Sequence, residues 1–411
     1  MHVRKVRAMD DILSQGGDRE PSPWPRRLAV IAALIAVVAG GAVYLSRSGH
    51  PHPLAAPTAV PATATQAPVP AGPDALSLPP EPDGITGPSL AWDRDLQLPV
   101  AGAQPEWFSP ASGRTQRIGG LPASRSGYQF TRIAGGWAVR AAATVPAGCG
   151  SCAEPPGPVW LLADGARSAT RVGTASLVAP AASAGAVWLT SYPPGANVAT
   201  TAGTAREVGA AGALTGPVTL PPGYAIDQGT DRGLLLTPAS QPPGDAVDKL
   251  WNPAAPRASQ AFAGVIAATP SEIAWTSPCA LQCDVQVLDL ATGKHARIAL
   301  PAGNSAASGT FSPDGRFLAL QASFGDTGDG GELAMQLEVA PAAGGRLTAV
   351  PGTFASSDAL VAYGWPGRGD SLVAEFSFTT KTQLASWNPG SSRPAVTAVR
   401  LETDQASLIL G

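Results

Sequence analysis

The stretch that decides the fold runs Gly309-Thr310-Phe311-Ser312-Pro313-Asp314-Gly315-Arg316-Phe317-Leu318-Ala319-Leu320. It predicts a strand, a Ser-Pro-Asp-Gly turn and a second strand of largely apolar residues. Pro313 presets its own φ, Asp314 can hydrogen-bond the neighbouring backbone, and Gly315 can take the positive φ that returns the chain. The stretch is therefore read as one β-hairpin.

The same hairpin recurs along the chain from about residue 86 onward. Five further copies run Tyr128 to Val139, Leu177 to Leu189, Tyr224 to Leu236, Val265 to Trp275 and Leu360 to Ala374. The second strands of neighbouring copies lie about 40 to 55 residues apart, which is close to the period of propeller blades. We read these six copies as the inner hairpins of a β-propeller.

Hairpins of a second kind, each an apolar strand followed by a small turn and a further strand, lie between the inner ones. Three are clear and begin at Trp107, Val159 and Val285; four are looser and run Asn197 to Val208, from Leu250, from Met335 and from Leu384. One inner hairpin and the outer hairpin after it make a four-stranded blade. The sequence thus predicts an all-β, seven-bladed β-propeller over residues 86–411, with six or eight blades as alternatives.

The seventh inner hairpin has to come from the ends of the chain. Ser89 to Val100 is expected to supply it, and Ala406 to Leu410 is expected to add a closing strand. Both terminal segments would then share one blade, so that no long sheet edge stays open.

The composition agrees with a fold of many short strands and turns. Charged residues make up 14% of the chain, which also contains 47 Gly and 42 Pro, against roughly 25% charged residues in an average globular protein. The formal net charge of -3 offers no positive footprint for nucleic acid. A nucleic-acid partner is therefore disfavoured.

The region before the propeller reads as a membrane anchor and a spacer. Residues 1–27 form a short basic tail, and residues 28–45 form an uncharged apolar run near the lower length limit of a transmembrane helix. Because Arg26 and Arg27 directly precede this run, the tail is expected in the cytoplasm and the propeller outside. Residues 46–85 are rich in Pro, Ala and Thr and predict a semi-rigid linker.

Two alternatives stay open at this end of the chain. The apolar run also fits a cleaved signal peptide, with small residues at Ala39-Gly40-Gly41 as the cleavage site. Met9 could be the true start of the protein. We expect an uncleaved anchor because the whole run is longer than the usual apolar core of a signal peptide.

Residues Phe311 to Ala319, Phe-Ser-Pro-Asp-Gly-Arg-Phe-Leu-Ala, resemble the repeat of TolB-like and WD40-like (PD40) β-propellers. The chain as a whole is similar to membrane-anchored bacterial proteins of that kind. Most other blades lack Ser-Pro-Asp-Gly, so the resemblance is specific over one blade only. It implies the fold and a tendency to bind partners, and it implies no catalytic residue.

The four cysteines form two close pairs, Cys149 with Cys152 and Cys279 with Cys283. In an extracytoplasmic compartment each pair predicts a small disulfide in the loop between the second and third strands of a blade. A redox dithiol is the alternative for Cys149 and Cys152, but the Pro-rich run that follows cannot continue as a helix. Three blades of separation make a zinc site shared by the two pairs implausible.

Few other residues suggest chemistry. His295 is the sole histidine of the propeller region and falls in an expected outer turn, which argues against a Ser-His-Asp triad or a histidine metal centre. Asp326, Asp329 and Glu332 form the densest acidic cluster, a candidate cation contact in a Gly-rich loop. Trp137, Trp188 and Trp275 fall at recurring positions and predict blade packing, whereas Trp365 is a candidate surface contact.

The function expected from the sequence is a protein-interaction or ligand-binding scaffold without catalysis, metal or cofactor, whose ligand is an unidentified protein or cell-envelope component. One alternative is a carboxylate-based hydrolase with its site at the mouth of the propeller channel. Convergence of two or three acidic residues from different blades on one pocket would favour that enzyme. A second alternative is a sensor that signals through the cytoplasmic tail.

Overall fold

The chain divides into two units, Met1–Gly72 and Pro73–Gly411. The computed structural model describes residues of the second unit alone, namely 92, 94–143, 152–239, 247–256, 259–276, 284–301, 304–324, 334–356, 360–367, 371–378, 381–391, 395–399 and 407–410. The tail at 1–27, the apolar run at 28–45 and the linker at 46–85 lie outside this range. Within it, no helix is long and apolar enough to cross a membrane.

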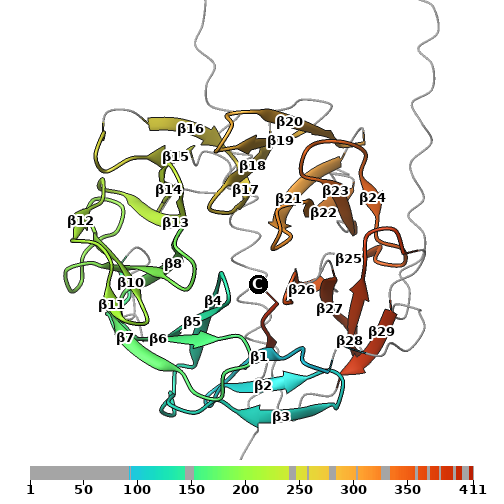
Figure 1. Ribbon diagram of the computed structural model, residues 1–411, viewed down its shortest axis with the longest axis horizontal. Helices are drawn as coiled ribbons and strands as arrows, with labels where there is room; N and C mark the ends of the chain where they lie inside the picture. Colours follow the sequence, from blue (N-terminus) through green and yellow to red (C-terminus); the bar gives the residue numbers. More distant parts are fainter. Residues whose placement is uncertain are drawn as a thin grey trace, which may run out of the picture. The chain divides into compact units, whose positions relative to one another are not determined.

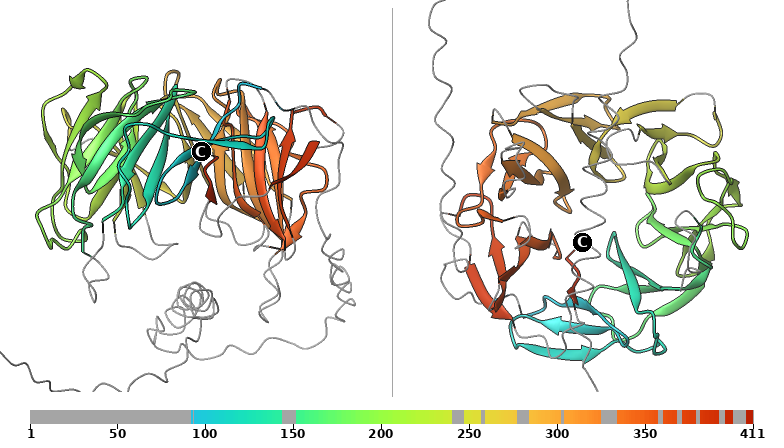
Figure 2. Two further views of the ribbon diagram at one scale, coloured as in Figure 1. Left: turned by 90° about the horizontal axis from the view of Figure 1, so that it is seen from below. Right: turned by 180° about the vertical axis from the view of Figure 1, so that it is seen from behind.

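Seven antiparallel sheets of four or five strands surround a central channel (Figure 1). The prediction of an all-β, seven-bladed propeller is confirmed. Within each blade the strands run back and forth between the two faces of the ring, as the side view in Figure 2 shows. We number the blades from 1 to 7 in the order in which their inner hairpins occur, with the closing blade last.

Blades 1 to 3 are formed by strands that follow one another along the chain. Blade 1 contains β4 (Tyr128–Ile133), β5 (Gly136–Ala141), β6 (Gly157–Ala163) and β7 (Thr170–Ala175). Blade 2 contains β8 (Leu177–Pro180), β9 (Val187–Ser191), β10 (Thr204–Gly209), β11 (Gly212–Ala213) and β12 (Val218–Thr219). Blade 3 contains β13 (Tyr224–Thr230), β14 (Gly233–Pro238), β15 (Val247–Trp251) and β16 (Ser259–Ala263).

Blades 4 to 6 continue in the same way. Blade 4 contains β17 (Val265–Ala268), β18 (Glu272–Thr276), β19 (Asp284–Asp289) and β20 (His295–Ala299). Blade 5 contains β21 (Asn304–Phe311), β22 (Phe317–Phe324), β23 (Ala334–Pro341), β24 (Thr348–Ala349) and β25 (Ala355–Ser356). Blade 6 contains β26 (Leu360–Gly364), β27 (Leu372–Phe378), β28 (Lys381–Trp387) and β29 (Ala395–Val399).

Blade 7 joins the two ends of the propeller. It contains β1 (Leu98–Ala101), β2 (Glu106–Ser109), β3 (Arg114–Arg117) and, as its innermost strand, β30 (Ser407–Leu408). β30 pairs with β1 through Val100↔Leu408 and Ala101↔Ser407. The prediction that both ends share one blade is confirmed.

The expected inner hairpin at Ser89 to Val100 is wrong. In the described part of that segment β1 is the second strand of blade 7, and the first strand is β30 from the other end of the chain. The N-terminal segment does not need a hairpin of its own to complete blade 7, because β30 from the other end of the chain pairs with β1 as the innermost strand.

The outer hairpin expected from Asn197 to Val208 is also wrong in its first half. Its second strand is instead the third strand of blade 2, β10, which begins only at Thr204. Residues 197 to 201 form a turn in which the Ala199 amide donates to the side-chain oxygen of Asn197 (2.8 Å) and the Thr201 amide to its carbonyl (3.0 Å). An asparagine that satisfies nearby amides in this way favours a turn over a strand.

Each junction between neighbouring blades holds its own cluster of buried apolar side chains. The cluster between blades 1 and 2 includes Val159 and Leu189, the one between blades 5 and 6 includes Val339 and Phe376, and the one between blades 6 and 7 includes Leu98 and Val373. Because every sheet buries both faces against its neighbours, the core of this fold is a ring of seven interfaces.

The recurring tryptophans pack between blades, as predicted, but not at equivalent positions. Trp137 belongs to the cluster between blades 7 and 1 and Trp275 packs on the cluster between blades 3 and 4, so both face the preceding blade. Trp188 faces the following blade, blade 3. Since neighbouring residues of a strand point to opposite faces, this difference reflects a change of register that the spacing along the sequence does not reveal.

Candidate functional site

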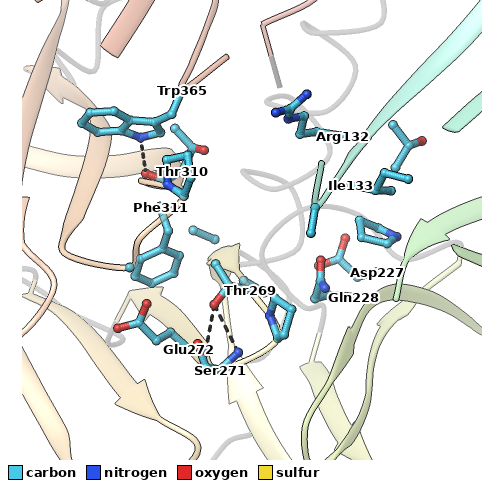
Figure 3. A pocket seen from close by; sticks show the side chains of 18 of the residues that line it. Arg132, Ile133, Asp227, Gln228, Thr269, Ser271, Glu272, Thr310, Phe311 and Trp365 are labelled. Carbon is cyan, nitrogen blue, oxygen red and sulfur yellow. Dashed lines mark hydrogen bonds between the residues drawn. The ribbon is translucent and has the colours of Figure 1, made fainter. Parts of the chain in front are cut away.

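The end of the channel nearest the inner hairpin turns opens into a cavity of about 960 Å³. Residues of all blades line it, from β4 in blade 1 to Trp365 in blade 6 and Leu410 beyond β30 in blade 7. Blades 1, 3, 4 and 5 contribute polar side chains, and Figure 3 shows how several of them lie around the cavity. We call this feature the channel cavity.

The Ser-Pro-Asp-Gly turn of blade 5 forms one wall of the channel cavity. Ser312 organises this turn: its hydroxyl donates to Asp314 (2.7 Å) and accepts from the Phe317 amide (2.9 Å). Asp314 also pairs with the guanidinium of Arg316. The Ser312 hydrogen bond and the contact with Arg316 lower the pKa of Asp314 to about 2. Its carboxylate is therefore ionised at neutral pH.

Glu272 of blade 4 lies against this turn. Gly315 has a φ of 70°, and a Cβ built on it would lie 2.8 Å from Glu272 Oε2. Oε2 is enclosed and has no hydrogen-bond partner among the described residues. Burial, followed by the nearby charges of Asp289 and Asp314, raises the pKa of Glu272 to about 7. Glu272 is thus a carboxyl poised between its two protonation states near neutrality.

Blade 3 contributes Asp227 and Gln228 through a β-bulge. The register of β13 against β14 shifts between Ile226 and Gln228, which leaves Asp227 as the extra residue. A bulge re-aims a side chain, and Asp227 is open to the channel cavity, where protein surrounds it. Enclosure in the channel and the neighbouring Asp248 raise the pKa of Asp227 to about 6.

Arg132 of blade 1 is the one cationic side chain among the described residues of the cavity wall. Its guanidinium donates to both carboxylate oxygens of Asp164 (2.5 and 2.9 Å) and lies 4.9 Å from the centre of the Trp137 ring. Asp164 therefore neutralises its charge. The carboxylates of Asp227 and Glu272 have no such partner among the described residues.

The rest of the wall is largely apolar. Phe311 is 7% exposed and lies beside Glu272 (Figure 3). Ile133 and Ile266 add aliphatic surface from blades 1 and 4. The channel cavity thus combines apolar walls with carboxylates from three blades, which is the usual make-up of a small-molecule site.

The structure places Trp365 in this wall and not on the outer surface. The indole is 4% exposed, donates from Nε1 to the Thr310 carbonyl (3.2 Å) and stacks on Phe317 of blade 5. An aromatic ring and a hydrogen-bond donor that both find partners in the neighbouring blade favour burial. The prediction of an exposed contact through Trp365 is therefore wrong.

The other predicted residues divide between described and undescribed parts. Cys149, Cys279, Cys283, Asp326, Asp329 and Glu332 lie outside the described residues, so the two disulfides and the cation contact stay predictions. Cys152 is half-buried at a bridge with Asn197, in the connection from the second strand of blade 1 to the third. The chain segment with Cys279 and Cys283 connects the equivalent strands of blade 4.

His295 opens β20, where its side chain is exposed and lies edge-on to Trp275, as expected for a solvated histidine. In the part of the chain that the structure describes, no three His, Cys, Asp or Glu side chains lie close enough to hold a metal ion.

Asp227, Gln228 and Glu272 were not singled out from the sequence. Asp227 is the one charged residue of its strand, Tyr-Ala-Ile-Asp-Gln-Gly-Thr. A lone charge in a strand of this kind is the signal that could have identified Asp227. Glu272 follows the turn of the fourth inner hairpin, at a position that in blade 3 is Gly233. Nothing in the sequence around Glu272 marks it as part of a cavity.

Comparisons with known proteins find likeness at the level of fold. No family model matches the chain, and no curated protein matches its sequence. TolB from Acinetobacter baumannii superposes with a TM-score of 0.37 and 10% identity over 74% of this chain and 66% of that protein. A protein from Lactobacillus plantarum superposes with a TM-score of 0.43 and 14% identity over 74% of this chain and 95% of its own.

Prolyl oligopeptidase B from Galerina marginata superposes with a TM-score of 0.46 and 10% identity over 79% of this chain and 50% of that enzyme. The chain therefore spans about two thirds of TolB and half of the peptidase. At these identities and scores the comparisons assign no activity.

Proposed function

We propose that the protein is a membrane-anchored, extracytoplasmic binding module that presents a ligand site in its channel cavity and carries out no covalent chemistry. The single observation that supports a site there is the cavity itself, about 960 Å³ in volume and bounded by residues of all seven blades. Its volume lies in the range of roughly 300 to 1,000 Å³ that small-molecule pockets occupy. Membrane anchoring and outward orientation rest on residues 28–45 and the two arginines before them.

The test is photo-crosslinking of the full-length protein in intact cells. A benzophenone amino acid at Ser271, an exposed turn residue of the cavity wall, should capture a discrete partner. The matched control places the same group at Arg117, an exposed residue of β3 on the outer edge of blade 7. If Ser271 forms no specific adduct, or if Ser271 and Arg117 form the same adducts, the result would count against a site in the channel.

Protease treatment of the same intact cells tests the orientation. We expect the propeller to be cut only when protease is supplied outside the membrane. Protection of the propeller in intact cells and cleavage after lysis would overturn the extracytoplasmic location.

A carboxylate-based hydrolase is the second candidate, because acidic residues of three blades face one cavity. Asp227, Glu272 and Asp314 come from blades 3, 4 and 5. A pKa of about 7 for Glu272 beside one of about 2 for Asp314 is the separation that a general acid and an ionised partner need. In this enzyme Glu272 would donate a proton to the leaving group of the glycoside or ester that is hydrolysed.

A panel of chromogenic glycosides and esters separates the two candidates. The hydrolase predicts turnover that falls at least about a thousandfold in Glu272→Gln, because the amide cannot donate an acidic proton. Absence of turnover across the panel, or turnover that persists in Glu272→Gln, would exclude a hydrolase that uses Glu272.

A further inference from the structure

We infer that the ligand of the channel cavity is an organic cation, an ammonium or guanidinium group carried on an apolar body. The inference rests on the proposed binding function and specifies its ligand. It is drawn from which hydrogen-bonding groups of the wall are already satisfied and which are left open.

Three side chains of blades 3 and 4 offer acceptors to the cavity. Gln228 is 7% exposed, and its amide nitrogen donates to the Gly229 carbonyl (2.8 Å), so its oxygen is the end left for a ligand. Asp227 beside it accepts no hydrogen bond from a described residue. Glu272 Oε2 has no partner among the described residues either. A buried acceptor without a donor is costly, and a ligand that brings several donors removes this cost.

The charges of the described wall select a cation. Asp164 holds the guanidinium of Arg132, and Asp314 of the wall pairs with Arg316. Asp227, Asp231 and Glu272 remain as wall carboxylates that form no ion pair with a described residue. An anion would meet these carboxylates, whereas an ammonium or guanidinium can form charge-assisted hydrogen bonds with them.

The apolar part of the wall requires more than a bare ion. Phe311, Ile133 and Ile266 add aromatic and aliphatic surface to the same cavity. An inorganic cation would leave this surface wet, and the described residues do not form a cluster that could coordinate a metal. A cation attached to an aromatic or aliphatic group fills both parts of the cavity.

The pKa values of the two carboxyls agree with this assignment. Enclosure in the channel raises the pKa of Asp227 to about 6, and burial raises that of Glu272 to about 7. Both carboxyls hold protons more tightly than in water because burial, followed by the charges of neighbouring carboxylates, disfavours their ionised forms. A bound cation would lower both pKa values, so its affinity should rise as the pH climbs from about 5.5 to 7.5.

Fluorescence titration of the full-length protein with dansylcadaverine, a primary ammonium on an aromatic group, tests the inference. The controls are the same dansyl chain with its amine acetylated, which is neutral, and one that ends in a carboxylate. We expect saturable binding of the ammonium, at least about tenfold tighter than either control. Competition by acetyl-Phe-Lys-amide, but not acetyl-Phe-Gln-amide, would identify a lysine side chain of a polypeptide as an equally good source of the cation.

Three variants locate the binding. Asp227→Asn and Glu272→Gln should each weaken the ammonium probe about tenfold and leave the neutral control unchanged. Glu106→Gln, a carboxyl of β2 outside the cavity wall, is the matched control and should change neither. Asp227 is open to the channel, so its variant keeps the test valid even if the more enclosed Glu272 variant is unstable.

Two results would overturn the inference. One is equal affinity for the ammonium and neutral probes, and the other is unchanged ammonium binding in Asp227→Asn together with Glu272→Gln. Neither result contradicts the proposed binding function, which fails instead if crosslinking from Ser271 captures nothing specific.

Discussion

Blades 5 and 7 hold their innermost strands by different means. In blade 5, β21 and β22 are neighbours in the chain and pair from Asn304↔Phe324 to Phe311↔Leu318, with one register shift between Ala306 and Ser308. In blade 7, β30 meets β1 from the opposite end of the propeller and forms two residue pairs. A short turn closes the first hairpin, whereas the whole ring has to form before the second can close, at a larger cost in chain entropy.

Neighbouring strands of the chain therefore form most of the propeller, whereas closure of the ring depends on the pairing of β30 with β1, which we call the closing joint. Leu408 and Leu410 are 2% and 1% exposed and pack with Leu98 and Val373 between blades 6 and 7. These two leucines, together with Ile409, which packs on the cluster between blades 7 and 1, are the described contribution of the C-terminal segment to ring closure. Changes at the closing joint should therefore lower the free energy of unfolding more, for each residue removed, than changes elsewhere in the propeller.

The largest expected effect is on this joint. Truncation after residue 406 removes β30 and the two buried leucines, and should lower the free energy of unfolding by roughly 4 kcal/mol or more, at ~2 kcal/mol for each leucine plus the lost strand pairing. Urea unfolding of the full-length protein and the truncated form measures the difference.

Single alanine substitutions refine that result. Leu408→Ala in blade 7 and Leu320→Ala in blade 5 should each cost about 2 to 5 kcal/mol, since both side chains are buried. Leu214→Ala is the control, because Leu214 is 53% exposed and should change stability by less than about 0.5 kcal/mol. A truncation less damaging than Leu320→Ala would break the comparison between the two blades.

The second prediction concerns a buried acid at the same joint. Glu375 of β27 is two residues from Val373 and so shares its face toward blade 7; it is 4% exposed, and its Oε2 has no hydrogen-bond partner among the described residues. Burial raises the pKa of Glu375 to about 7. Its folded-state pKa lies above the unfolded value of 4.5, so stability should be lost as the pH rises from about 4.5 to 7.

Glu375→Gln should remove that loss, so that the variant gains on the wild type by roughly 2 kcal/mol between pH 5 and pH 8. Thermal or urea unfolding at a series of pH values measures this gain. Asp284→Asn, at a carboxylate paired with Arg297 in blade 4, is the control. A difference between Glu375→Gln and wild type that does not change with pH would contradict an ionising buried acid.

The third prediction tests the turn of blade 5. Gly315→Ala should cost about 1 to 2 kcal/mol for its positive φ, with a further cost because the new Cβ meets Glu272 Oε2. Gly293→Ala is a matched control, since Gly293 also has a φ of 70° but nothing within 4 Å of its Cβ position. Equal losses in the two variants would show that the Glu272 contact adds nothing.

The smallest effect is expected at the ion pair beside that turn. The side chains of Arg316 and Asp314 are 60% and 40% exposed, and exposed pairs contribute about 0 to 1 kcal/mol. Arg316→Ala should lower the free energy of unfolding by less than about 0.5 kcal/mol, and less again in 1 M salt. A loss above about 2 kcal/mol would mean that this turn depends on the ion pair more than on Ser312 and Gly315.

Much of the fold could be predicted because its signals are local. Each inner hairpin needs only a turn and two apolar strands within about fifteen residues, and turn residues such as Pro313 and Gly315 declare their conformations directly. The spacing of these hairpins then implies blades. The predicted scaffold function and membrane anchor follow from composition and one apolar run, and they stay predictions.

The channel cavity could not be predicted, because its parts are far apart in the chain. Asp227 faces the channel on account of one bulged residue in β13, and Glu272 gains its raised pKa from burial and from Asp289 and Asp314 of its surroundings. Trp365 looked like an exposed turn residue because its partners, Thr310 and Phe317, belong to another blade. Such contacts depend on how one sheet packs on the next.

The sequence alone determined the repeat and the turns of six inner hairpins and favoured seven blades, since these depend on backbone preferences and on apolar residues close together in the chain. The tertiary structure decided which terminal strand closes the ring, which face Trp188 presents and which carboxylates meet in the channel. The physical reason is that a shift of one residue along a strand exchanges its two faces, and only packing between blades selects among such registers.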